Sequence, residues 1–107
     1  MVPLAVAAAG SLALGGGAAE ALRAHHGKDT GWTFLHDDGV AVQDNESDGN
    51  SVEIQYQRRG SPGTTRHLWN HSGAGTTAYS ARASTVFKIR ICEERDWAPD
   101  SCASWVA

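Results

Sequence analysis

The amino-acid sequence predicts an all-β domain: a small antiparallel β-sandwich or barrel of about six or seven short strands. Apolar and polar residues alternate with a period of two along several segments, and helical spacing is nearly absent. Clusters of Gly, Asp, Asn, Ser and Pro, which favour turns, separate these segments. Two cysteines near the C-terminal end, Cys92 and Cys102, predict one disulfide that closes a short loop.

The clearest alternation occurs in residues 52–57 and 87–91. Every second residue in these segments is large and apolar, and the residues between are polar or charged. This pattern is typical of strands with one buried and one solvated face. We expect one shared core to bury Val52, Ile54, Tyr56, Phe87, Ile89 and Ile91. We expect the surface to carry Glu53, Gln55, Lys88 and Arg90.

Weaker strand patterns occupy residues 32–36, 40–43, 65–71 and 76–81. The segments between them are rich in residues that tolerate positive φ or favour a turn. Asp38-Gly39 lies between two apolar runs and predicts a β-hairpin turn. Short strands with turns at this spacing are typical of a small sandwich or barrel.

The first 21 residues have the features of a signal peptide. They are mostly Ala, Leu, Val and Gly, and Ala19-Glu20-Ala21 fits the small-x-small pattern that signal peptidase reads. A membrane anchor is the alternative, but so much Ala and Gly gives little drive for a stable membrane span. Residues 22–30 show no periodicity and predict a flexible N-terminal arm. Residues 31–107 suffice for a single β domain.

Charge and cysteine content restrict the function classes. The formal net charge is −3 and leaves no basic footprint, so we expect no nucleic-acid binding and no polybasic membrane contact. A signal peptide directs the chain to an oxidising compartment, where two thiols pair. We therefore expect a secreted, extracellular protein in which the Cys92–Cys102 disulfide contributes about 2.5–3 kcal/mol to stability.

No motif predicts catalysis or a bound cofactor. Residues 44–49 place acidic residues at alternate positions, like the opening of a calcium loop, but Gln55 stands where a bidentate Glu is needed. A solvated hairpin loop is the better interpretation. The five histidines lack zinc-site spacing, and no carboxylate lies in an apolar context that would raise its pKa. We expect no enzyme activity, no metal and no cofactor.

Two features suggest binding. Trp97 lies inside the predicted disulfide loop and Trp105 lies just beyond it, where rigid aromatic side chains would anchor a protein or a sugar. Covering the open end of the sheet is the alternative use of both. Arg58 and Arg59 end a predicted strand beside a turn, which would suit a bait for a trypsin-like protease. A charged strand end that discourages edge pairing is the simpler interpretation.

Four runs of the sequence, residues 42–52, 68–75, 87–92 and 100–107, together carry a resemblance. They resemble the small secreted β-domain proteins that are abundant in actinobacteria, and the cysteine-bearing tail is the most specific part. Many of those proteins carry a second cysteine pair with one partner near the first acidic turn, whereas this chain has Gln43 there. The chain is also similar in size, export and β character to the small adaptor subunit of umbrella-like toxin particles. This likeness implies binding rather than catalysis.

We therefore expect a secreted, non-enzymatic interaction or adaptor module that binds an extracellular protein partner. The residues expected to contact that partner are Trp97, Trp105, Arg58 and Arg59. One alternative is a protease inhibitor that uses the Arg58-Arg59 loop. Another is a lectin-like module that binds carbohydrate through exposed Trp side chains.

Overall fold

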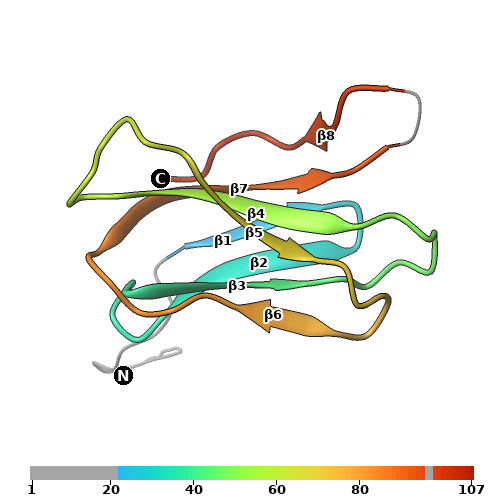
Figure 1. The fold of residues 1–107 in the computed structure, drawn as a ribbon, viewed down its shortest axis with the longest axis horizontal. Helices are drawn as coiled ribbons and strands as arrows, with labels where there is room; N and C mark the ends of the chain where they lie inside the picture. The colour runs from blue at the N-terminus through green and yellow to red at the C-terminus, as the bar shows by residue number, and fades with distance from the viewer. Residues whose placement is uncertain (1–21, 96–97) are drawn as a thin grey trace, which may run out of the picture.

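The computed structural model describes residues 22–95 and 98–107, and in this part of the chain eight strands form two antiparallel sheets (Figure 1). The strands are β1 (Arg23–His26), β2 (Asp29–Phe34), β3 (Gly39–Gln43), β4 (Val52–Arg58), β5 (Arg66–Asn70), β6 (Thr77–Tyr79), β7 (Val86–Glu93) and β8 (Ser101–Cys102). The strand order is β1-β2-β3-β6 in the first sheet and β5-β4-β7-β8 in the second. This arrangement confirms the predicted all-β fold and makes it a sandwich.

The core lies between the two sheets and consists of inward-facing residues of their strands. Its buried members are Ala24, Val40, Val42, Val52, Ile54, Tyr56, Val86, Ile89 and Ile91. Five of the six predicted core residues belong to this set. The register places Ile54 opposite Ile91 and Tyr56 opposite Ile89. The two segments with the clearest alternation are therefore direct neighbours in one sheet, and they share one buried face.

Gly31 shows how closely the two sheets approach each other. A Cβ atom at this position in β2 would collide with the side chains of Ile54 and Ile91 from the second sheet. Only glycine leaves room for these two isoleucines, whose side chains are fully buried. The position therefore sets the spacing of the layers at the centre of the core.

Phe87 differs from its prediction, because it is half-buried and Val86 takes the core position at 1% exposure. The pairing of β4 with β7 shifts between Gln57 and Arg58: Gln57 lies opposite Lys88, whereas Arg58 lies opposite Val86. Phe87 is thus the extra residue of a β-bulge, which moves the alternation of β7 by one position.

The outward-facing residues of β4 are more buried than predicted. Glu53 is 2% exposed, and Gln55 and Gln57 are each 8% exposed. β4 lies between β5 and β7, and polar side chains of both neighbours reach over it. His67 pairs with Glu53, and Arg90 donates to Gln55. The predicted direction of these side chains is correct, but the prediction that they are solvated is wrong because a central strand has neighbours on both sides.

The two ends of the domain contain strands that the sequence did not predict. Residues 22–30, expected to form a flexible arm, instead contain β1 and the start of β2, which pair as a hairpin and bury Ala24. β8 has two residues. Such short strands show too little alternation to be recognised. The signal peptide expected in residues 1–21 lies outside the described residues. Within the described ranges, no helix is long and apolar enough to cross a membrane.

The β2–β3 hairpin turns through residues 35–38 rather than at Asp38-Gly39. Leu35, His36 and Asp37 all have left-handed backbone conformations, with φ of 53°, 60° and 67°. This conformation costs roughly 1–2 kcal/mol per non-glycine residue, so other contacts must hold the turn. The Thr33 hydroxyl donates to the Asp37 carboxylate at 2.5 Å, and the Val86 amide donates to the Asp37 carbonyl at 2.8 Å.

Candidate functional site

The C-terminal segment returns along the second sheet and is fixed there by a disulfide. Cys92 in β7 is bonded to Cys102 in β8, which confirms the predicted pairing. Beyond β8, Val106 forms an antiparallel bridge with Ile89. The tail therefore lies beside β7 as an additional edge segment. Trp97, one of the two predicted aromatic anchors, lies outside the described residues.

Trp105 lies on the outward side of the second sheet. Its neighbour Val106 packs against the core, so the two side chains point to opposite sides of the sheet. The Lys88 ammonium group lies 4.7 Å from the centre of the indole ring, and the Arg90 guanidinium carbon lies 4.6 Å from it. Both distances are within the range of cation–π interactions. All three side chains are half-buried, so they form one ordered unit.

We call the surface around this unit the tail face. It consists of His67 and Trp69 from β5, Gln55 and Gln57 from β4, Lys88 and Arg90 from β7, and Trp105. Hydrogen bonds fix the positions of the two glutamine side chains. The Arg90 Nε donates to the Gln55 Oε1 at 2.8 Å, and the Gln57 Nε2 donates to the Thr65 hydroxyl at 3.1 Å. A surface that is ordered before binding loses less conformational entropy when a partner docks.

The tail face is positively charged, although the chain has a net charge of −3. Lys88 and Arg90 lie beside each other along β7. The one carboxylate that β4, β5 and β7 place on this side of the sheet is Glu53. It is 2% exposed and lies 2.6 Å from the His67 Nδ1. The Glu53 carboxylate is thus buried and lies against His67, whereas Lys88 and Arg90 lie closer to the surface that a partner meets.

The structure gives the two predicted arginine contacts different surroundings. Arg58 is 5% exposed, and its guanidinium group donates to three backbone carbonyl groups, those of Asp38, Ala81 and Ser84. Arg58 therefore connects the second sheet to the β2–β3 turn and the loop before β7, and the prediction that it contacts a partner is not supported. Arg59 is exposed, and its guanidinium carbon lies 5.6 Å from the centre of the Phe87 ring.

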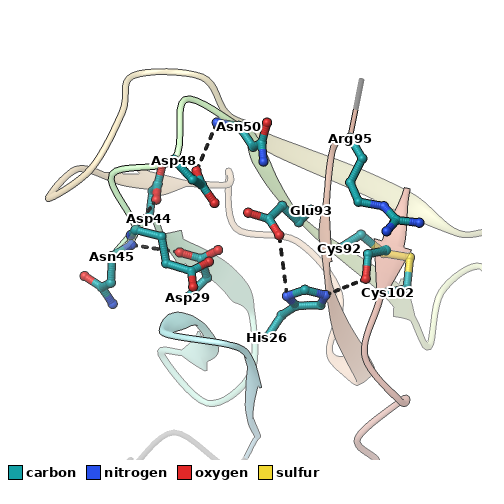
Figure 2. A network of polar contacts seen from close by, with 12 residues as sticks. His26, Asp29, Asp44, Asn45, Asp48, Asn50, Cys92, Glu93, Arg95 and Cys102 are labelled. Atoms are coloured by element: carbon teal, nitrogen blue, oxygen red, sulfur yellow. Dashed lines mark hydrogen bonds and ion pairs between the residues drawn. A yellow bond between two sulfur atoms is a disulfide. The ribbon is translucent and has the colours of Figure 1, made fainter. Parts of the chain in front are cut away.

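A cluster of carboxylates occupies one end of the sandwich (Figure 2). One carboxylate oxygen from each of Asp29, Glu46 and Glu93 lies within 4.8 Å of the other two. These residues come from β2, the β3–β4 loop and β7, so both sheets contribute. Figure 2 shows Asp48 directed toward Glu93 from the same loop as Glu46. Residues 44–49, expected to form a solvated hairpin loop, therefore lie partly against other acidic groups.

Asp29 is the most buried member of this cluster, at 1% exposure. Burial, together with the nearby charges of Glu46 and Asp44, raises its pKa from 3.8 to about 6. The Asn45 amide, which donates to the Asp29 Oδ1 at 2.8 Å, opposes this rise in pKa. The expectation that no carboxylate has a raised pKa is therefore wrong, because the burial of Asp29 arises from the fold.

Glu93 and Asp48 lie together at the edge of the cluster, and each changes the pKa of the other. The hydrogen bond to Asp48, followed by burial, raises the pKa of Glu93 from 4.5 to about 7. The same hydrogen bond and the Asn50 amide lower the pKa of Asp48. The proximity of the two carboxyl groups therefore favours protonation of Glu93 over protonation of Asp48.

His26 joins this end of the molecule to the disulfide-bonded tail. Its Nε2 lies 2.9 Å from the Ser101 hydroxyl, and its Nδ1 lies 4.0 Å from the Glu93 Oε1 (Figure 2). Crowded carboxylates of this kind hold either protons or a cation. The raised pKa values of Asp29 and Glu93 favour protons, and a cluster of acidic groups alone does not identify a metal, so we assign none.

The outward side of the first sheet also carries aromatic side chains. Trp32 and Phe34 from β2 lie near Tyr79 from β6, and the Phe34 and Tyr79 rings meet edge to face at 5.9 Å. Ala41 lies between Trp32 and Tyr79 in the register and is fully buried. Tyr79 is 64% exposed. The Arg23 guanidinium carbon lies 5.2 Å from the centre of the Trp32 ring, so both outward faces of the sandwich combine aromatic and cationic side chains.

No family model, no curated protein and no solved structure matches the chain. The functional argument therefore depends on the surfaces of the domain itself. Sequence analysis identified Trp105 as a contact residue but treated Lys88 and Arg90 as ordinary surface residues. The sequence shows that Lys88 and Arg90 alternate along one strand. It does not show that the tail returns along β7 and places the Trp105 indole beside them.

Proposed function

We propose that this protein is a secreted, non-enzymatic interaction module that binds an extracellular protein partner through the tail face. The observation that carries the proposal is the ordered unit of Trp105, Lys88 and Arg90 on an outward face of the sandwich. The disulfide and the signal-like residues 1–21 support export. The resemblance to small secreted β-domain proteins is consistent with a binding role.

The composition of the tail face suits the centre of a protein interface. Trp and Arg are enriched among residues that dominate binding energy, and such residues cluster at well-packed positions. Trp105 is held by two cations and by its neighbour Val106 in the core, so it loses little freedom on docking. Trp97, in the adjoining loop, stays a predicted second anchor.

The two alternative functions have weaker support. A protease inhibitor that uses the Arg58-Arg59 loop as bait could present only Arg59, because the Arg58 guanidinium group is bonded to three carbonyl groups. A lectin-like function would use Trp69 and Trp105 as stacking platforms. The Trp105 ring already contacts Lys88 and Arg90, which favours a charged partner over a neutral sugar.

Capture from culture medium with matched variants tests the proposal. The mature domain is immobilised as wild type, as Trp105→Ala and as Tyr79→Ala, and the retained proteins are quantified by mass spectrometry. Tyr79 is a suitable control because it is aromatic, exposed and on the opposite face. Trp105→Ala should reduce capture of the partner about 30-fold, the effect of losing about 2 kcal/mol. Tyr79→Ala should retain capture.

Thermal melts of all three proteins separate binding from folding. A folded Trp105→Ala protein with full capture would contradict the use of the tail face. Loss of capture in Tyr79→Ala alone would assign the partner to the aromatic face of the first sheet. Binding of glycans in place of any protein would support the lectin-like alternative instead.

A further inference from the structure

We infer that the partner presents to the tail face an extended polypeptide segment with acidic residues at alternate positions. This inference rests on the proposed function, because it specifies the chemistry of the partner at the same surface. It is carried by the charge of the tail face and by the spacing of its two cations along β7.

The cations of the tail face contact neutral groups, and its carboxylate is buried. The carboxylate of Glu53 is buried and bonded to His67. Lys88 and Arg90 contact the neutral indole of Trp105, and the bond from the Arg90 Nε goes to the neutral amide of Gln55. The positive charge of these two side chains is therefore not neutralised within the tail face. Complementary charge across an interface speeds association and excludes partners with like charge.

The spacing argument follows from the geometry of a β-strand. Lys88 and Arg90 lie two positions apart on β7 and point to the same side of the sheet, so their Cα atoms are about 6.8 Å apart. An extended peptide has the same repeat, because its alternate side chains also lie about 6.8 Å apart on one side. Two acidic residues separated by one residue would therefore meet both cations, with Trp105 packed beside the peptide.

The chain itself has acidic residues at alternate positions in residues 44–48. A second copy of the chain could therefore be the partner if this loop were free to bind the tail face. Asp44 is 2% exposed, and Glu46 is half-buried in the carboxylate cluster. Asp48 is exposed, so the folded loop presents one of these three alternate carboxylates freely and not two in succession. This favours a different protein over self-association, and sedimentation velocity of the purified domain checks the point.

A synthetic peptide in which Glu and Ser alternate is the direct probe. Isothermal titration of the mature wild-type domain should show binding that weakens as NaCl is raised from about 50 mM to about 500 mM, because salt screens exposed charges. A peptide in which Lys and Ser alternate should not bind. Lys88→Glu should weaken binding about tenfold or more, as expected when a close charge pair becomes a like-charge contact.

Two further variants keep the result interpretable. Lys88→Gln removes the charge without adding repulsion and should weaken binding less than Lys88→Glu. Arg66→Glu is the control for Lys88→Glu, because both variants replace a cation by a carboxylate. Arg66 is exposed at the start of β5, and its side chain contacts Ser61. Arg66→Glu should bind as wild type does. Equal losses in Arg66→Glu and Lys88→Glu would show a non-specific charge effect and overturn the inference.

The remaining outcomes also decide the question. Three results would each overturn the inference. The acidic peptide could fail to bind, or a sulfated polysaccharide could bind more tightly than the peptide does. The third result is self-association of the domain that Lys88→Glu abolishes. If the peptide fails while Trp105→Ala still abolishes capture of a protein from culture medium, the proposed function stands without this inference. If capture is also independent of Trp105, both fall.

Discussion

Replacing Asp29 by Asn should remove the part of the pH dependence of stability that arises from the raised pKa of Asp29. The pKa of Glu93 is also raised, to about 7, and its contribution should be common to both proteins. Asp29 is 1% exposed and lies against the carboxylates of Glu46 and Glu93. Its ionised form is therefore unfavourable in the folded protein, whereas the unfolded chain leaves the group in water. Asn keeps an oxygen that can accept the Asn45 amide, but it carries no charge at any pH.

The magnitude and the sign follow from the raised pKa of Asp29. A pKa of about 6 in the folded protein, against an ordinary value of 3.8, corresponds to about 3 kcal/mol between the protonated and ionised limits. The folded protein holds this proton more tightly than the unfolded chain does. The stability that the proton provides is therefore fully present below about pH 4 and is lost as pH rises through about 6.

Urea unfolding followed by Trp fluorescence between pH 4 and pH 8 measures this effect. The free energy of unfolding of Asp29→Asn, relative to that of wild type, should rise by about 2–3 kcal/mol across this interval. Asp100→Asn, which changes an exposed carboxylate outside the cluster, should follow the wild-type pH profile. If wild type and Asp29→Asn had parallel profiles, the raised pKa and the argument from burial would both be refuted.

Three other substitutions test the fold, and a fourth, Arg59→Met, serves as a control. Cys102→Ser should lower the free energy of unfolding by about 2–4 kcal/mol and leave a thiol on Cys92 that reacts once the chain is unfolded; complete alkylation of unreduced wild type would show that the bond is absent. Ile89→Ala should cost about 2–5 kcal/mol, since this side chain is fully buried, and a cost under about 1 kcal/mol would contradict its place in the core. Arg58→Met should cost about 3 kcal/mol by leaving three carbonyls without their donor, whereas Arg59→Met should change stability by less than about 0.5 kcal/mol; equal effects in denaturant unfolding would reverse their assignments.

The alternation of residues 52–57 and 87–91 predicted the centre of the second sheet because a period of two assigns each side chain to a face. It could not predict the β-bulge at Phe87, since the extra residue is recognisable only once the partner strand is known. It also could not predict how deeply Glu53 and Gln55 are buried. Their burial depends on long side chains of β5 and β7, and the sequence does not show which strands are neighbours.

The candidate sites were predictable to different degrees. The pairing of Cys92 with Cys102 followed from their number and spacing. The position of Trp105 beside Lys88 did not, because it depends on the path of the tail after the disulfide. The carboxylate cluster was missed for a similar reason. Asp29 and Glu93 are far apart in the sequence, and the antiparallel strand order brings them to the same end of the sandwich.

Zero-length cross-linking tests most directly the claim that a partner binds the tail face. A carbodiimide joins a lysine amine to a carboxylate in contact with it, and the chain has two lysines, Lys88 on the tail face and Lys28 in the β1–β2 turn. Cross-linking of the domain in culture medium, followed by peptide mass spectrometry, should attach the partner's acidic residues to Lys88 and leave Lys28 without links to that partner. Links to the partner through Lys28 alone would place the interface at the opposite end of β7 from Lys88 and contradict the account.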